Sequence, residues 1–232
     1  MRPLLLGHRG HREPRWNEAE NTLAAFERAL AQGCDGFELD LHCTADGRIV
    51  VHHDAAVRVD SEAVAIAEAS LRTLRRLRPE MATLDQVLRR FRQRAWMDLE
   101  IKAGAAVEGT AAELKRRRPQ AGCVVSSFEP EVLGRMAKLE AGLPLCLNLR
   151  RPCSLRRLAG LRARTGLSWV APHVAGCTAW YVRRLRAAGW RVLVWTVNRP
   201  AKMRLLARAG VDAIVSDDPG RLREILGSKQ TR

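Results

Sequence analysis

The chain has 232 residues, of which 47% are hydrophobic and 28% charged, and its formal net charge is +15. This length is close to that of one α/β barrel, and the composition is typical of a globular protein. No apolar run is long enough for a membrane span or for the central region of a signal peptide, so we expect a cytoplasmic protein.

The positive charge has two readings. It could form a surface for nucleic acid or an anionic membrane, or it could simply solvate the outer faces of arginine-rich helices. The basic residues are spread over the whole length, and one Tyr and four Phe offer little base stacking. We therefore expect no nucleic-acid partner, while transient contact with an anionic membrane stays open and no oligomeric state is predicted.

The six cysteines are scattered and form no C-x-x-C pair. This spacing argues against a zinc site or a disulfide framework, and we expect reduced thiols that mostly pack in the core.

Short β-type runs alternate with helical patterns along the chain. We predict strands over residues 4–7, 36–42, 96–101, 123–127, 143–148, 168–171, 191–196 and 213–216. Helices are predicted over residues 22–32, 84–94, 106–117, 130–139, 154–164, 179–188, 200–209 and 219–226. Eight strands joined by helices predict a TIM (β/α)8 barrel, with residues 1–232 forming a single domain. The sequence has no G-x-G-x-x-G or Walker pattern, which argues against a nucleotide-binding sheet.

One segment, about residues 44–83, departs from this alternation. A hairpin-type turn at 44–47 precedes a short strand at 49–53, which we expect to pack over the barrel mouth. Residues 63–78 are then predicted to form a small helical excursion, and the tail 227–232 is expected to be frayed.

The second predicted strand has an unusual acidic face. Because side chains alternate along a strand, Glu38, Asp40 and His42 project to one side and apolar residues to the other. Two carboxylates about 4 Å apart repel by roughly 4 kcal/mol at an effective dielectric near 20, so a cation, a proton or water must relieve them. The plainer alternative is a solvated edge strand.

Polar residues also follow most of the other predicted strands. His8 and Arg9 follow the first strand, Glu100 and Lys102 end the third, and Asp217 follows the last. In TIM barrels the active site is built at the carboxyl ends of the strands, so we expect these side chains to meet at one mouth.

Eight short motifs together resemble one enzyme family, the glycerophosphodiester phosphodiesterases. In order they are His8-Arg9-Gly10, Glu20-Asn21-Thr22, Glu38-x-Asp40, Asp46-Gly47, His53-Asp54, Glu100-x-Lys102, Trp195-Thr196-Val197-Asn198 and Asp217-x-Pro219. The resemblance covers essentially the whole chain. It implies a TIM barrel that hydrolyses glycerophosphodiesters to sn-glycerol 3-phosphate and an alcohol with the help of a divalent cation. By family analogy, the substrate's glycerol 2-hydroxyl attacks first and water then opens a cyclic phosphate.

The resemblance also implies roles for individual residues. Glu38, Asp40 and Glu100 would be the metal ligands, His8 and His53 the acid/base pair, and Arg9 and Lys102 the phosphate contacts. Three carboxylates form a hard, oxygen-rich site that suits Mg²⁺ or Ca²⁺ better than Zn²⁺.

Other residues keep two interpretations. Glu20 would lie in the metal's outer shell or would favour a helix start, and Asn21 could be that helix's N-cap. Trp195 would pack against the substrate's glycerol or belong to the core, and Asp217 would act in the site or cap the last helix. His42, His52 and His173 receive no catalytic role, and His52 is read as a structural neighbour of His53.

The chain departs from the family after His53-Asp54, where Val57-Arg58-Val59-Asp60 replaces the usual Leu-x-Arg-Thr-Thr run. This segment helps to cover the site in relatives, so the substrate preference is open. One alternative is a lysophospholipase D activity on lysophospholipids. Another, of a different class, is a basic barrel that binds nucleic acid or an anionic membrane without catalysis.

Overall fold

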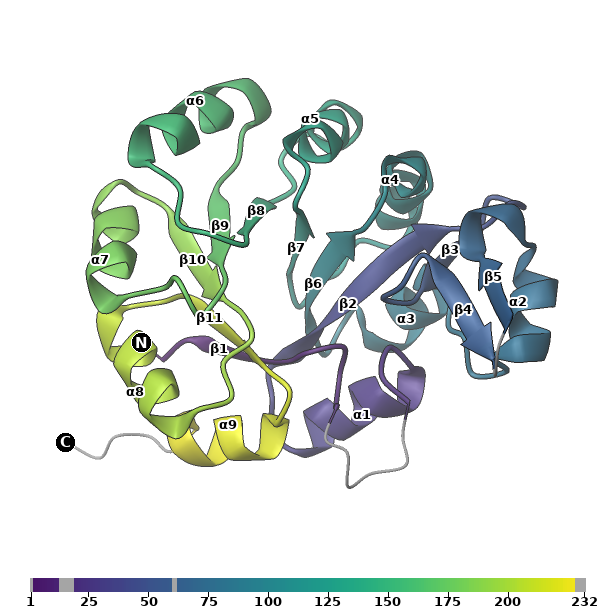
Figure 1. Cartoon of the computed structure of the whole chain (residues 1–232), viewed down its shortest axis with the longest axis horizontal. Helices are drawn as coiled ribbons and strands as arrows, with labels where there is room; N and C mark the ends of the chain where they lie inside the picture. The colour runs from purple at the N-terminus through teal and green to yellow at the C-terminus, as the bar shows by residue number, and fades with distance from the viewer. Residues whose placement is uncertain (1, 13–18, 60–61, 228–232) are drawn as a thin grey trace.

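The computed structural model describes residues 2–12, 19–59 and 62–227. Eight parallel strands form a barrel, closed because β1 pairs with both β2 and β11 (Figure 1). These strands are β1 (Leu4–Gly7), β2 (Gly36–Cys43), β6 (Trp96–Ile101), β7 (Cys123–Ser127), β8 (Leu145–Leu149), β9 (Trp169–Pro172), β10 (Arg191–Val194) and β11 (Ala213–Ser216). The predicted TIM barrel is confirmed.

Helices surround the barrel as an outer ring (Figure 1). They are α1 (Leu23–Ala31), α3 (Leu84–Phe91), α4 (Val107–Arg116), α5 (Pro130–Leu139), α6 (Leu155–Thr165), α7 (Ala179–Ala187), α8 (Pro200–Ala209) and α9 (Pro219–Leu226), with a 3-10 turn, η2 (Gly104–Ala106), before α4. The Thr83 hydroxyl and the Gln86 side chain form a capping box at the start of α3. Gly166 ends α6 in the left-handed conformation, with φ 71°. Among the described residues, none of the helices has the length and apolarity that crossing a membrane requires.

The hydrophobic core has two layers. Between the strands and the outer helices, Phe26 stacks on Phe37 with ring centroids 4.2 Å apart, and Phe91 meets Phe37 edge-on at 5.1 Å. Inside the barrel, Leu6, Cys146, Trp169, Leu193 and other residues form a separate apolar layer. The six cysteines are free, and four of them are buried, as predicted.

The excursion after β2 differs in part from its prediction. The short strand β3 (Ile49–Val51) pairs antiparallel with the end of β2. It is followed by a hairpin of β4 (Ala56–Val59) and β5 (Glu62–Ala65), then by η1 (Ile66–Glu68) and α2 (Leu71–Leu77). The prediction of helix over 63–78 was therefore wrong for residues 63–65, because Val64 pairs with Val57 across the hairpin. The helix begins only after Ser70, whose hydroxyl accepts the Thr73 N–H.

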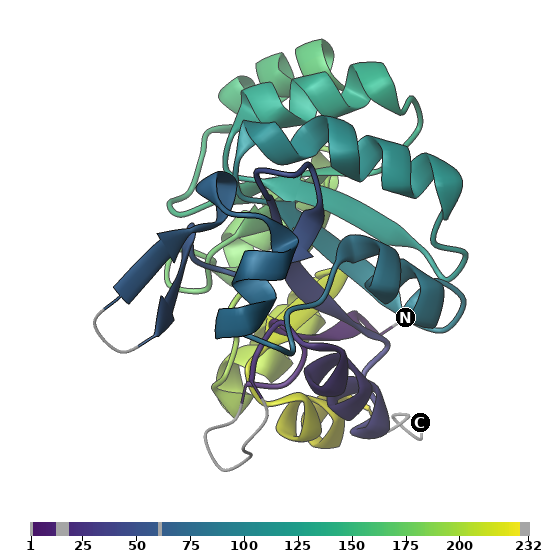
Figure 2. The same cartoon turned by 90° about the vertical axis from the view of Figure 1, so that its right-hand side faces the viewer.

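The excursion has a hydrophobic cluster of its own, in which Val57, Ile66, Leu74 and Met81 are buried. Its hairpin projects beyond the barrel on the side that faces the viewer in Figure 1, as the turned view in Figure 2 shows. The excursion therefore stands at the edge of the barrel mouth.

Smaller differences concern the ends of elements. The predicted strand 191–196 ends at Val194, and the strand 143–148 begins at Leu145. Of the tail that we expected to be frayed, residues 228–232 lie outside the described residues.

Many arginines on the outer helices form ion pairs with carboxylates of the same chain. Asp85 accepts from Arg89, Arg116 and Arg117. Glu27 likewise pairs with Arg90 and Arg94. Much of the positive charge therefore solvates helix faces, in line with the plainer of its two readings.

Candidate active site

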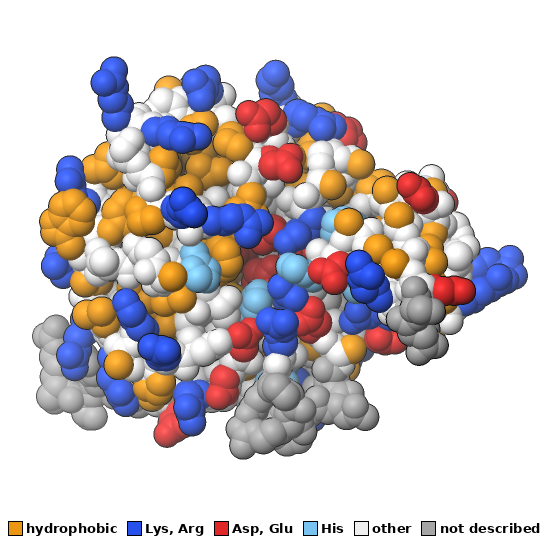
Figure 3. All heavy atoms as spheres, viewed as in Figure 1, with side chains coloured by type: hydrophobic (Ala, Val, Ile, Leu, Met, Phe, Trp, Pro, Cys, Tyr) orange, Lys and Arg blue, Asp and Glu red, His pale blue; other side chains and the backbone are white. Residues whose placement is uncertain are grey.

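The acidic cluster lies at the mouth of the barrel. Asp40 of β2 is in register with Glu100 of β6, and Glu38 is two residues earlier on the same face of β2. One carboxylate oxygen from each of these three side chains lies within 4.8 Å of the others. Figure 3 shows acidic atoms deep in a hollow at the centre of this face, with histidine atoms around them.

Burial and the charges of neighbouring carboxylates disfavour the ionised forms of Glu38 and Glu100. Burial, followed by the charges of Asp40 and Glu100, raises the pKa of Glu38 well above its ordinary value. Burial and the charge of Asp40 also raise the pKa of Glu100. Asp98 lies beneath the cluster and accepts a 2.6 Å hydrogen bond from Ser126, and burial raises its pKa to about 7.

Two cations, the half-buried Lys102 and the buried Arg9, partly balance this charge. Lys102 Nζ lies 2.7 Å from Glu100 Oε1 and 3.2 Å from Asp40 Oδ1. Arg9 Nε lies 3.3 Å from Asp40, and its Nη1 donates to Glu20 at 2.6 Å. Burial would lower the pKa values of Lys102 and Arg9, but their carboxylate partners hold both above the ordinary values. Both predicted phosphate contacts therefore line the acidic cluster.

The loop after β1 and the residues just before α1 hold the carboxylates of Glu38 and Asp40 in place through strained backbone. Arg9 and Asn21 adopt the left-handed region with φ 53° and 61°, which costs of order 1–3 kcal/mol for a non-glycine residue. In this conformation the Arg9 N–H donates to Glu38 Oε2 at 2.9 Å. The Asn21 amide donates to Asp40 Oδ2 at 2.9 Å and accepts the Asp40 N–H at 3.3 Å.

Asn21 is therefore not the helix N-cap. Thr22 caps α1 instead, because its hydroxyl accepts the Ala25 N–H. Glu20 is linked to the acidic cluster through Arg9, which it binds, and it also lies 2.5 Å from Arg12 Nε.

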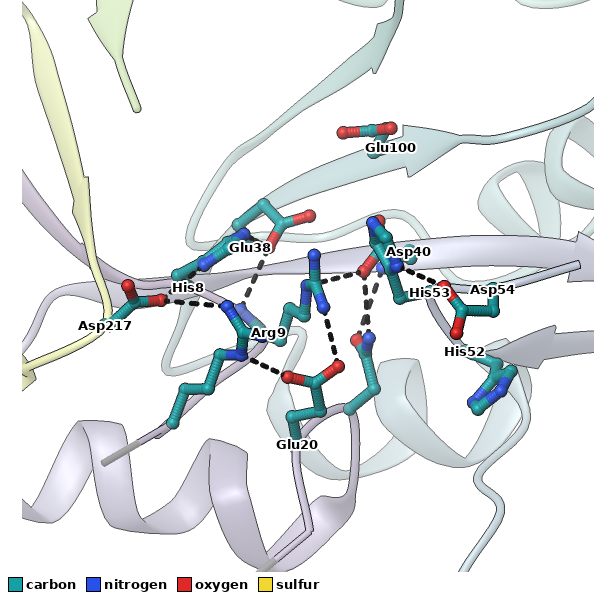
Figure 4. Close-up of polar contacts among 12 residues, drawn as sticks. His8, Arg9, Glu20, Glu38, Asp40, His52, His53, Asp54, Glu100 and Asp217 are labelled. Carbon is teal, nitrogen blue, oxygen red and sulfur yellow. Dashed lines mark hydrogen bonds and ion pairs between the residues drawn. The ribbon is translucent and has the colours of Figure 1, made fainter. Parts of the chain in front are cut away.

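The two histidines of the predicted pair lie on either side of Glu38 in the close-up (Figure 4), and each bonds to an aspartate. His8 Nδ1 lies 2.6 Å from Asp217 Oδ1, and His53 Nδ1 lies 2.7 Å from Asp54 Oδ1. A carboxylate can only accept, so Nδ1 carries the hydrogen in both rings and Nε2 of the neutral form has a free lone pair. Nε2 of His8 is 3.9 Å from Glu38 Oε2.

The two histidines in turn lower the pKa values of these aspartates. The hydrogen bond from His53 lowers the pKa of Asp54. Burial would raise the pKa of Asp217, but the bond from His8 holds it below the ordinary value. Asp217 does not cap α9, because Asp218 accepts the Arg221 N–H in that role.

The opposite rim of the mouth is aromatic. Trp195 donates its indole N–H to the Ala171 carbonyl at 2.7 Å and meets Phe128 edge-on, with centroids 5.5 Å apart. The ring of His173 packs against Trp195 at 4.8 Å. Arg150 lies over Phe128 at 4.2 Å and lines the same pocket as His8 and His53.

Five residues that line the pocket were given no role in the predicted site: Asp98, Phe128, Asn148, Arg150 and Val215. Asn148 donates to Glu100 Oε2 at 3.2 Å. Phe128 and Asn148 stand at or just after strand ends, which is the signal that could have found them.

His42 and His52 support the loop that carries His53. His42 donates from Nε2 to the His53 carbonyl at 3.2 Å, and burial lowers its pKa. His52 donates to the Ala56 carbonyl and accepts from Arg78 Nη1 at 2.9 Å. Burial and the Arg78 charge lower the pKa of His52, so both rings stay neutral around pH 7 and serve structure.

A divalent cation fits the acidic cluster. Three carboxylates converge there, two of them buried, and a positive ion would relieve the raised pKa values of Glu38 and Glu100. All three offer hard oxygen ligands of the kind that Mg²⁺ and Ca²⁺ prefer. Glu38, Asp40 and Glu100 are the residues that could hold it.

Comparison with known proteins identifies the family of this chain. A glycerophosphodiester phosphodiesterase of Caldanaerobacter subterraneus subsp. tengcongensis is 28% identical over 237 residues, covering 94% of this chain and 96% of the relative. The solved glycerophosphodiester phosphodiesterase of Thermotoga maritima has the same fold, with a TM-score of 0.83, 24% identity and coverage of 97% and 99%. A phosphodiesterase of Oleispira antarctica, solved with the product sn-glycerol-3-phosphate, also matches at TM-score 0.83 and 24% identity, covering 98% of each chain. Residues 8–221 match the model of the glycerophosphoryl diester phosphodiesterase family, and the chain belongs to this family of phosphoric diester hydrolases.

Proposed function

We propose that this protein hydrolyses glycerophosphodiesters to sn-glycerol 3-phosphate and an alcohol in a metal-dependent reaction that uses two histidines, and that the whole chain acts as one catalytic domain. One observation carries this proposal: the carboxylates of Glu38, Asp40 and Glu100 lie within 4.8 Å of one another, between two aspartate-bound histidines. A protein that only bound anions would gain nothing from this acidic pocket.

The diester phosphate is proposed to bind over the acidic cluster. Arg9 and Lys102 reach this position from two sides of Asp40 and present positive charge to the phosphate oxygens. A Mg²⁺ or Ca²⁺ ion held by Glu38, Asp40 and Glu100 would supply electrostatic stabilisation of the negative charge that develops on those oxygens.

His8 and His53 are proposed to move the protons. In the first step one histidine takes the proton of the glycerol 2-hydroxyl at Nε2 as its oxygen bonds to phosphorus. The other donates a proton from Nε2 to the alcohol oxygen as its bond to phosphorus breaks. In the second step water opens the cyclic phosphate, with proton transfers in the reverse sense. Asp217 and Asp54 hold the two rings in the required orientation.

The test is the release of sn-glycerol 3-phosphate from glycerophosphocholine and glycerophosphoethanolamine, with Mg²⁺, with Ca²⁺ and with excess chelator. We expect turnover that the chelator abolishes. Glu38→Ala, His8→Ala and His53→Ala should each lower kcat by about 10²-fold or more, the usual contribution of an acid/base group or metal ligand. Glu131→Ala, an exposed carboxylate on α5, is the matched control and should behave as the wild type.

The outcomes separate the parts of the proposal. Full activity in chelator would exclude the metal site, and loss of activity in His8→Ala with full activity in His53→Ala would exclude the two-histidine scheme. Divalent ions should also raise the Tm of the wild type but not of Glu38→Ala, a measurement that does not depend on turnover.

A second candidate is a lysophospholipase D activity at an anionic membrane. It is favoured by exposed arginines on the excursion beside the mouth, among them Arg58 on β4 and Arg72 and Arg76 on α2. Such residues attract anionic lipid headgroups. If lysophospholipids in anionic vesicles, and not glycerophosphocholine, are turned over in a salt-sensitive way, this candidate replaces the first.

A further inference from the structure

Arg150 occupies an unusual position among the cations of the mouth. The Lys and Arg side chains among the residues lining this pocket are Arg9, Lys102 and Arg150. Arg9 and Lys102 contact carboxylates of the cluster, whereas Arg150 forms no ion pair within the described parts of the chain. Its guanidinium carbon lies over the face of Phe128, 4.2 Å from the ring centroid.

This contact holds the guanidinium at the rim without using its hydrogen-bonding groups. Stacking on an aromatic ring occupies the face of the guanidinium system, so its N–H donors remain available. Phe128 is itself fixed against Trp195, whose indole N–H is bonded to the Ala171 carbonyl. The stack Arg150–Phe128–Trp195 therefore presents a preset cation to whatever enters the pocket.

The charge balance of the mouth gives that cation a role. The three cluster carboxylates would be offset by a divalent ion and one of the two inner cations, and Glu20 offsets the charge of Arg9. The inner site then has little net charge left with which to attract an anionic diester. Arg150 supplies the missing positive charge.

We propose that Arg150 is a substrate-binding residue that holds anionic oxygens of the bound diester, an inference that rests on the proposed function. These oxygens belong either to the phosphate or to an anionic group on the leaving alcohol. Both sources share one chemistry, a planar or tetrahedral oxyanion that accepts paired N–H donors.

The first test is calorimetric titration of the Mg²⁺-supplemented protein with sn-glycerol 3-phosphate, which needs no turnover. If Arg150 contacts the phosphate, Arg150→Gln should weaken binding by about tenfold, the value of one charged hydrogen-bond pair, and Arg150→Lys should weaken it less. The matched control is Arg151→Gln, which removes an exposed neighbouring charge outside the pocket lining and should leave binding unchanged.

The second test compares kcat and KM for glycerophosphoserine, glycerophosphoglycerol and glycerophosphocholine. A rise in KM for all three substrates, with weaker product binding, assigns Arg150 to the phosphate. A rise confined to glycerophosphoserine, with unchanged product binding, assigns it to the anionic leaving group.

Equal behaviour of Arg150→Gln and Arg151→Gln in both tests overturns the inference, as does a wild type that neither binds the product nor turns over any diester. A lower Tm of Arg150→Gln without a change in Kd or KM would show that the stack of Arg150, Phe128 and Trp195 serves only stability, and it would also overturn the inference. If the wild type turns over diesters and Arg150→Gln has the same Kd and KM as the wild type, the proposed function stands and only this inference is removed.

Discussion

Asp98 allows a stability prediction with a defined sign. This aspartate is buried beneath the acidic cluster, accepts a hydrogen bond from Ser126, and has a pKa raised from 3.8 to about 7, mainly by burial. The folded state therefore keeps a proton on Asp98 at pH values where the unfolded chain has lost it. The contribution of Asp98 to the free energy of unfolding therefore falls as the pH rises from about 4 to about 7, and it changes no further above that range.

The magnitude follows from the shift. A change of about three pKa units corresponds to about 4 kcal/mol, because one unit is worth about 1.4 kcal/mol. Asn resembles the protonated form in shape and in its lack of charge, and its oxygen can still accept from Ser126, although its amide has two N–H donors where the acid has one O–H. We therefore expect Asp98→Asn to match the wild type near pH 4 and to exceed it by up to about 4 kcal/mol near pH 8.

The assay is urea denaturation in chelator at several pH values, with Glu131→Gln as an exposed control. Curves of the wild type and Asp98→Asn that run parallel over the whole pH range would refute the reasoning, because the ionisation of Asp98 would then contribute nothing. A variant less stable at every pH would show instead that the new amide hydrogens lack acceptors.

Three further outcomes are expected. Asn21→Ala should weaken Mg²⁺ binding by about 10- to 100-fold, since Asp40 loses its two contacts, and unchanged affinity by titration would contradict this. Asp217→Asn should lower kcat by about 10²-fold and alter the pH profile of kcat/KM, because an amide can donate to Nδ1 of His8 and so favour the tautomer with hydrogen on Nε2. An unaltered profile would count against the orienting role of Asp217. Phe91→Ala should cost about 3–5 kcal/mol in urea denaturation, and a loss below about 1 kcal/mol would mean that the aromatic cluster repacks.

The features predictable from sequence were those that depend on local periodicity. The alternation of Glu38 and Asp40 with apolar residues placed both carboxylates on one face of β2, and that face is where the structure has them. The barrel followed from eight strands separated by helices. Each of these signals lies within a few residues of chain.

Other features depend on contacts between distant segments. Residues 63–65 are Ala, Val and Ala in a stretch whose alanines suit a helix, yet pairing with β4 makes them a strand. Asn21 resembles an N-cap until its left-handed backbone aims it at Asp40. Arg150 is one of 40 Lys and Arg residues, and only the adjacency of β7 and β8 brings it over Phe128.

The excursion after β2 has a consequence for how the mouth can change. Its apolar cluster is separate from the two layers of the barrel core, and Arg78 ties it to the site through His52 and the Glu20 carbonyl. Insertions or replacements within residues 56–77 would thus reshape the rim while leaving the packing of the strands untouched. The fold keeps the catalytic floor and the substrate-facing edge in separate structural units, so evolution or protein engineering can alter selectivity without rebuilding the enzyme.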